Sequence, residues 1–91
     1  MTDYLSRDYT ADETWQDDEL VSDTDNPLAN ITIINDDDTN SISVKLNSNL
    51  NDAITVKAGE VITLILPVVR IFYRATAGTP ALRVVSDGES N

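Results

Sequence analysis

The chain of 91 residues contains no cysteine and no histidine, and it has only three glycines. Without cysteine, disulfide bonds cannot reinforce the fold, and without cysteine or histidine a structural zinc site is nearly excluded. Nucleophilic catalysis through a Ser–His or Cys–His pair is also excluded, and no glycine-rich phosphate loop is present. Carboxylates are abundant, but a glycosidase needs a walled cleft that so short a chain can hardly build. We therefore expect no enzyme, no catalytic residues and no cofactor.

Basic residues are scarce as well, with six Lys and Arg against 16 Asp and Glu and a net charge of −10. Binding to phosphates requires clustered Lys and Arg, so we expect no nucleic acid among the partners. No apolar stretch has the character of a signal peptide or a membrane span. The sequence thus predicts a soluble protein that is made in the cytoplasm and binds no membrane.

The acidic residues concentrate in residues 1–26, which hold nine Asp and Glu, one arginine and three of the five aromatic residues. Thr10 and Glu13 have the spacing of a capping box, which predicts a short helix over about residues 11–20. A helix of this length is marginal in isolation, so we interpret residues 1–26 as an acidic docking arm that becomes ordered when it binds. A solvated tail is the alternative, against which the aromatics argue. The candidate anchors of the arm are Tyr4, Tyr9, Trp15 and Leu20.

From Pro27 onward, apolar residues alternate with polar ones, which is typical of half-buried strands. Many short strands without helices between them predict an antiparallel β-sandwich or a small barrel in residues 27–91. A module of about 65 residues buries only roughly 60% of its unfolded surface, so we expect oligomerisation or attachment to a larger partner. The six predicted strands cover about residues 30–33, 41–47, 54–57, 61–66, 68–76 and 81–86.

Two details of this pattern bear on assembly. Residues 61–66 are apolar on both sides, which suggests a strand covered on both faces, with a partner subunit as a candidate for the second cover. Glycine-containing turns at residues 58–60 and 77–80 are predicted to join consecutive strands, the first of them as a tight hairpin.

The five basic residues of the module all fall on the polar side of their strands and would form a basic face for the acidic arm. The contact would occur within one chain or by exchange between neighbours, while an ordinary solvated sheet face is the alternative. Apolar anchors would supply most of the affinity, because one exposed ion pair contributes only about 0 to 1 kcal/mol. The candidate contact residues are Arg70, Phe72, Arg74 and Arg83, with Lys45 and Lys57 on the same polar side.

Asp36, Asp38 and Asn40 place oxygen atoms at alternating positions, as at the start of an EF-hand calcium loop. The match stops there, because Ser41 stands where that loop needs glycine and Asn47 where it needs glutamate. We interpret the segment as a solvated acidic turn and expect no metal, with surface calcium as the weaker alternative.

The sequences of several turns and their flanking strands resemble those of a known group of proteins. Residues 55–60, 64–67, 69–71 and 76–84 look like the hairpins of small β-sandwich structural proteins of tailed bacteriophage virions. The resemblance spans about residues 54–86, and it implies a capsid decoration or cement protein that docks on neighbouring subunits through its N-terminal arm. A neck or tail protein is the alternative. The implied location is the virion, and the implied partners are copies of the chain, as a trimer first, and a major capsid or other virion protein.

Two further functions fit parts of the sequence. An acidic DNA mimic that inhibits a nucleic-acid-binding host protein would use carboxylates in place of phosphates, but it needs them on a rigid face. A carbohydrate-binding module would need Tyr73 or Phe72 as a stacking platform. The scarcity of aromatic residues outside the arm argues against the second function.

Overall fold

The structure is a computed structural model that describes residues 4–22 and 25–88. Within these residues it contains eight β-strands and no helix, and hence none long and apolar enough to cross a membrane. The strands are β1 (Leu5–Thr10), β2 (Gln16–Glu19), β3 (Ile31–Asn35), β4 (Ile42–Leu46), β5 (Ile54–Val56), β6 (Val61–Leu64), β7 (Arg70–Ala75) and β8 (Ala81–Ser86).

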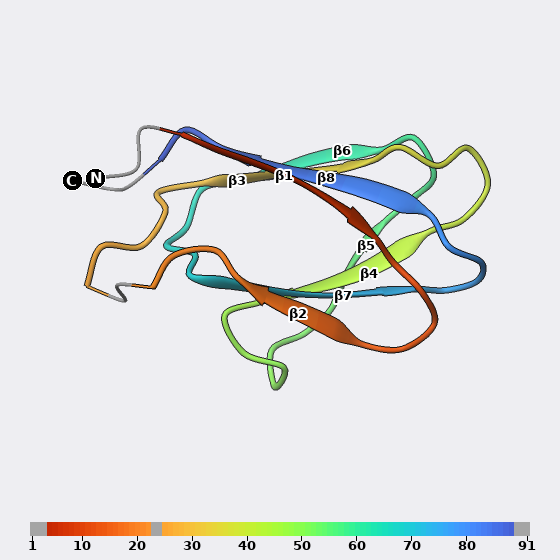
Figure 1. The fold of residues 1–91 in the computed structure, drawn as a ribbon, viewed down its shortest axis with the longest axis horizontal. Helices are drawn as coiled ribbons and strands as arrows, with labels where there is room; N and C mark the ends of the chain where they lie inside the picture. Colours follow the sequence, from red (N-terminus) through yellow and green to blue (C-terminus); the bar gives the residue numbers. More distant parts are fainter. Residues whose placement is uncertain (1–3, 23–24, 89–91) are drawn as a thin grey trace.

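The strands form two antiparallel sheets that pack face to face (Figure 1). Sheet A has the order β1-β8-β3-β6, and sheet B has the order β2-β7-β4-β5. The all-β antiparallel sandwich predicted from the alternating pattern is therefore confirmed. All six predicted strands are present as β3 to β8, because their alternate apolar side chains point between the sheets.

The core fills the space between the two sheets. Ile31 and Ile33 of β3 are fully buried opposite Ile42 and Val44 of β4, as alternation on a pleated strand requires. The buried Asn35 closes one end, since its side-chain nitrogen donates to the carbonyl oxygens of Asn40 and Val56 at 2.9 and 3.0 Å. Its polar atoms are thus satisfied, and sheet A is joined to the edge of sheet B.

The predicted helix over residues 11–20 is wrong, and the described part of residues 1–26 is not an arm separate from the sandwich. β1 pairs with β8 in sheet A, and β2 pairs with β7 in sheet B. Leu5, Ala11 and Leu20 are buried in the common core. The residues of the apparent capping box lie at and after the end of β1, where the chain crosses between sheets. Residues 1–3 and 23–24 of the predicted arm lie outside the described residues.

The structure also corrects the first of the two predicted turns. Residues 57–60 form a tight turn, in which the Glu60 backbone N–H donates to the Lys57 oxygen at 2.9 Å. Gly59 adopts a φ of 73° there. The turn does not close a hairpin, because β5 belongs to sheet B and β6 to sheet A. The turn at 77–80 joins the consecutive strands β7 and β8 as predicted, and it too crosses from one sheet to the other. Turn chemistry predicted the bends, but it carries no information about which sheet the chain enters next.

Candidate functional site

One side of the sandwich, formed by β1 and β2, is closed by polar side chains that bridge the two sheets. Arg7 Nη1 lies 2.8 Å from Asp18 Oδ2, and the Tyr9 hydroxyl donates to the same oxygen at 2.5 Å. The Tyr9 ring packs on that of Tyr73, with ring centres 4.8 Å apart. Tyr9 and Asp18 therefore act as a latch between the sheets.

The pKa values of this latch reflect the same contacts. Partial burial raises the pKa of the Tyr9 hydroxyl, and the hydrogen bond to Asp18 raises it further. Burial alone would raise the pKa of the Asp18 carboxyl, but the hydrogen bonds from Tyr9 and Arg7 and the charge of Arg7 outweigh it and lower that pKa. The latch is thus built for a neutral tyrosine beside an ionised aspartate.

The opposite side, formed by β5 and β6, is open. Val61 and Ile65 at the two ends of β6 are 57% and 88% exposed on the outer side of sheet A. Behind the edge lies an apolar groove of about 230 Å³ between the sheets, lined in part by Ile54, Leu64 and Leu66. The unpaired backbone of an edge strand beside exposed apolar side chains is a template for pairing with another chain.

The register places two exposed apolar residues at the same end of sheet A. Leu64 pairs with Ile31 at the end of β6, and Leu5 pairs with Ser86 at the start of β1. Both pairs lie at the end of the sheet where β3 begins and β8 finishes. Tyr4, which is 74% exposed, and Ile65 therefore occupy this end on opposite edges, Tyr4 beside β1 and Ile65 beside β6.

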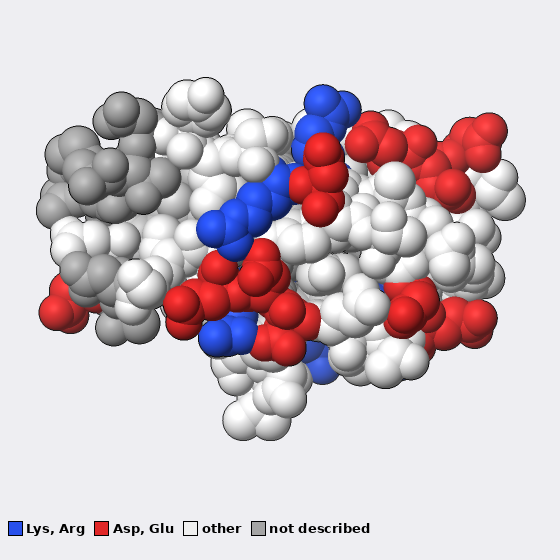
Figure 2. All heavy atoms as spheres, viewed as in Figure 1, with Lys and Arg blue, Asp and Glu red and all other residues white. Residues whose placement is uncertain are grey.

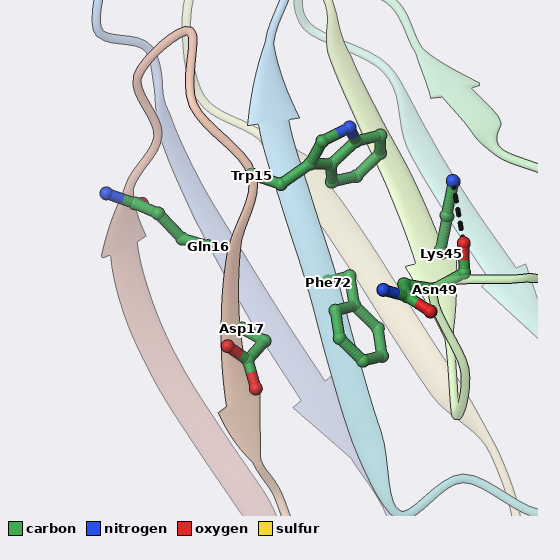
Figure 3. A pocket seen from close by; sticks show the side chains of 6 residues that line it. All are labelled: Trp15, Gln16, Asp17, Lys45, Asn49 and Phe72. Carbon is green, nitrogen blue, oxygen red and sulfur yellow. Dashed lines mark hydrogen bonds between the residues drawn. The ribbon is translucent and has the colours of Figure 1, made fainter.

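The outer face of sheet B carries a pocket of about 260 Å³ that is lined by aromatic and polar side chains. Figure 3 shows Trp15 reaching from the start of β2 across β7, with the Phe72 ring on β7 beside it. Lys45 and Asn49 border the pocket on the β4 side, and Asp17 borders it on the β2 side. Lys45 Nζ lies 4.8 Å from the centre of the Trp15 ring. This contact fixes the indole while leaving it partly exposed.

The predicted basic face is divided between the two sheets. Arg70 and Arg74 lie on β7 of sheet B, whereas Arg83 lies on β8 of sheet A and pairs with Asp36 at 3.3 Å. Arg70 pairs with Asp17 and with Glu19 of the neighbouring β2. Figure 2 shows acidic and basic side chains gathered beside one another near β1 and β2. The acidic segment thus contacts the chain's own bases, as strand β2 rather than as a docked helix.

The predicted anchors have different surroundings. Leu20 is buried in the core, and Tyr9 packs against that core and belongs to the latch. Trp15 lies over Arg74, whose Cζ is 4.8 Å from the ring centre, and only Tyr4 is freely exposed. Sequence reasoning missed the pocket that Trp15 forms with Phe72, because it assigned the two residues to different modules. Residues 15–19 carry no alternation of apolar and polar residues, since Trp15 is their only apolar side chain, so the pattern that predicted the other strands could not have found strand β2.

The candidate calcium residues make hydrogen bonds and an ion pair within the protein. Asp36 accepts from Arg83, and the Asp38 carboxylate accepts from the Thr39 hydroxyl at 2.9 Å. Asp37 caps the backbone N–H groups of Thr39 and Asn40. In the described ranges, no group of three Asp, Glu, His or Cys residues is placed to hold a metal ion. The interpretation as an acidic turn accounts for these contacts without calcium.

The sequence matches no known protein family and no curated protein. Solved structures share the fold at low identity. A protein of the Bacillus endospore appendages, described as disulfide-linked pili, is 14% identical, with a TM-score of 0.70 over 94% of this chain and 86% of that one. Streptomyces albus HEPD with Fe(II) and 2-hydroxyethylphosphonate bound is 12% identical, with a TM-score of 0.62 over 97% of this chain. Hydroxypropylphosphonic acid epoxidase from S. wedmorenis is 15% identical, with a TM-score of 0.58 over 91%.

The last two similarities correct the expectation that a module of this kind is not an enzyme. Both structures are of enzymes, and in HEPD the shared fold occupies 19% of the chain and in the epoxidase 41%. The small size of this chain therefore does not exclude catalysis. Iron sites with two histidines and one carboxylate need side chains that this sequence lacks, since it contains no histidine.

Proposed function

We propose that this chain is a structural subunit that assembles with copies of itself, the β6 edge of one copy pairing with the β1 edge of the next. The observation that carries the proposal is the placement of Tyr4 and Ile65 at the same end of sheet A on opposite edges. When β1 of a neighbour lies beside β6, the start of β1 meets the end of β6. Tyr4 of one copy then covers Ile65 of the other.

The strand directions favour this arrangement. Each neighbouring pair in sheet A is antiparallel, so β1 and β6 run in opposite directions across the four strands. A second copy in the same orientation therefore continues the antiparallel alternation without any change in the fold. Such a contact joins two different edges, so it generates a ring or an open array rather than a closed pair.

The outer side of β6 suits a partner that is itself acidic. Its outward residues Val61, Thr63 and Ile65 are uncharged, and so are Thr32 and Ile34 on the adjoining strand β3. In a chain with a net charge of −10, this strip lets a second copy approach with the least repulsion. It is also the strand that the sequence predicted to be covered on both faces, with a partner subunit as one candidate cover.

Two comparisons support a structural role in an assembly. The Bacillus appendage protein, which shares this fold over most of both chains, comes from pili, and pili are built from repeated subunits. The resemblance of residues 54–86 to small virion proteins points in the same direction. A bacteriophage particle is the setting that we propose on that second ground, with decoration of the capsid ahead of a place in the neck or tail.

Disulfide trapping tests the contact directly, because the natural chain has no cysteine. A Tyr4→Cys variant is mixed with an Ile65→Cys variant under mild oxidation, and cross-linked dimers are followed on non-reducing gels. We expect the mixture to cross-link faster than either variant alone, since only the mixed pair brings the two thiols together across one edge contact.

A Leu50→Cys variant is the matched control. Leu50 is 90% exposed, as open as Ile65, but it lies in the loop between β4 and β5 of sheet B. A mixture of Tyr4→Cys with Leu50→Cys should cross-link only at the rate of random collision. Equal rates for the Ile65→Cys and Leu50→Cys mixtures would overturn the proposed edge contact.

A further inference from the structure

We infer that the pocket on the outer face of sheet B binds a single neutral sugar ring. Its walls combine the rings of Trp15 and Phe72 with the polar side chains of Asp17, Lys45 and Asn49. The site lies on the sheet opposite to the one that carries the proposed assembly edge, so it adds a function that does not depend on assembly.

The aromatic walls supply the first requirement for a sugar. The C–H groups on one side of a pyranose ring are apolar and slightly positive, and they pack on the negative face of an aromatic ring. The Trp15 indole is held in place by two cations, since Lys45 Nζ and Arg74 Cζ each lie 4.8 Å from its ring centre, and the Phe72 ring lies beside it. A fixed indole loses little conformational entropy when a ligand binds.

The polar rim supplies the second requirement, which is a set of donors and acceptors for hydroxyl groups. Arg70 holds Oδ2 of Asp17, which leaves Oδ1 without a hydrogen bond to any residue in the described ranges. Lys45 donates to the backbone oxygen of Asn49 at 2.9 Å, and the side-chain amide of Asn49 makes no hydrogen bond to a residue within those ranges. An acceptor, an amide and an ammonium group around two rings match adjacent hydroxyls that both donate and accept.

Charge and size narrow the ligand class. The lining contains one carboxylate, Asp17, which also pairs with Arg70, and one ammonium group, Lys45, so the formal charges of the lining cancel, which suits a neutral molecule. The volume of about 260 Å³ lies just below the roughly 300 to 1,000 Å³ that is typical of sites for drug-sized ligands. One sugar ring, free or at the end of a glycan, is the ligand of this size that has both an apolar face and paired hydroxyls.

The indole N–H of Trp15 provides a single probe, because the chain has only one tryptophan. Its cross-peak is followed by NMR while the full chain is titrated with the methyl glycosides of glucose, galactose and mannose and with N-acetylglucosamine. Glycerol, which has hydroxyls but no ring face, is the control ligand. We expect a saturable shift with at least one sugar and none with glycerol. The absence of a shift with all four sugars, or an equal shift with glycerol, would overturn the inference.

Variants then distinguish a loss of sugar binding from a loss of folding. Phe72→Leu keeps an apolar side chain but removes the ring, and Asp17→Asn removes the charged acceptor. Each should weaken sugar binding about tenfold, which corresponds to the loss of one aromatic contact or of one hydrogen bond to a charged group. Asp8→Asn, on the outer face of sheet A, should leave affinity unchanged. Equal affinity of Phe72→Leu and the natural chain, both shown to be folded by their NMR spectra, would contradict the assignment.

Discussion

The two sides of the sandwich differ in how their edge strands are held: polar contacts join the two sheets on one side, and apolar side chains are exposed on the other. On the β1 and β2 side, Arg7, Tyr9 and Asp18 tie the sheets together. On the β5 and β6 side, exposed Val61 and Ile65 flank an apolar groove with no such latch in the described residues. The difference indicates that the first side is tied together within the chain, whereas the second leaves the β6 edge open to the β1 edge of another copy in the proposed assembly.

The largest expected effect comes from removing the closed side altogether. Deletion of residues 1–22 removes β1 and β2 and the core residues Leu5, Ala11 and Leu20. The remaining chain should lose its cooperative thermal unfolding transition, as measured by circular dichroism, because both sheets lose an edge strand and the core loses its cover. A truncated chain that stayed folded would instead support a separate N-terminal arm.

A single core substitution on this side should have the next largest effect. Leu20→Ala leaves a cavity beneath the end of β2, and we expect it to reduce the free energy of unfolding by about 2 to 5 kcal/mol in urea titration. Leu50→Ala is the control, since its side chain is 90% exposed and its loss should change stability by less than about 0.5 kcal/mol.

The latch should have a smaller, pH-dependent effect. We expect Asp18→Asn to lower stability by about 1 kcal/mol at neutral pH, a value reduced by the partial exposure of the pair. The folded state lowers the pKa of Asp18, so its contribution is present above the unfolded pKa of about 3.9 and is lost as the pH falls through the folded value. Urea titrations of both proteins should therefore converge in acid. A constant difference down to the lowest pH would contradict the latch.

Most strands of the sandwich could be predicted from the sequence, whereas strand β2 and the pocket could not. Alternating apolar residues predicted β3 to β8 and the sandwich, because burial of one strand face leaves that period in the sequence. No such alternation runs through residues 15–19, because charged residues occupy both faces of β2, so composition concealed the strand. The pocket required knowing that Trp15 lies beside Phe72, and such a pairing between distant segments is set by sheet order rather than by local pattern.

The smallest stability effect should come from the open side, and there it should be accompanied by a loss of assembly. Ile65→Asp places a charge on a side chain that is already 88% exposed, so it should change the free energy of unfolding by no more than about 0.5 kcal/mol. The same charge at the edge of β6 should prevent pairing with a second copy, as charges do on natural edge strands. Urea titration beside a measurement of mass in solution checks both halves of this expectation.

Sedimentation velocity over a rising series of protein concentrations tests the central claim most directly. At about 0.15 M salt, where charges beyond roughly 8 Å are screened, the natural chain should form larger species as its concentration rises. Ile65→Asp should remain a monomer throughout, while Leu50→Asp should associate like the natural chain. A natural chain that stays monomeric, or an Ile65→Asp variant that associates equally well, would contradict assembly through the open edge.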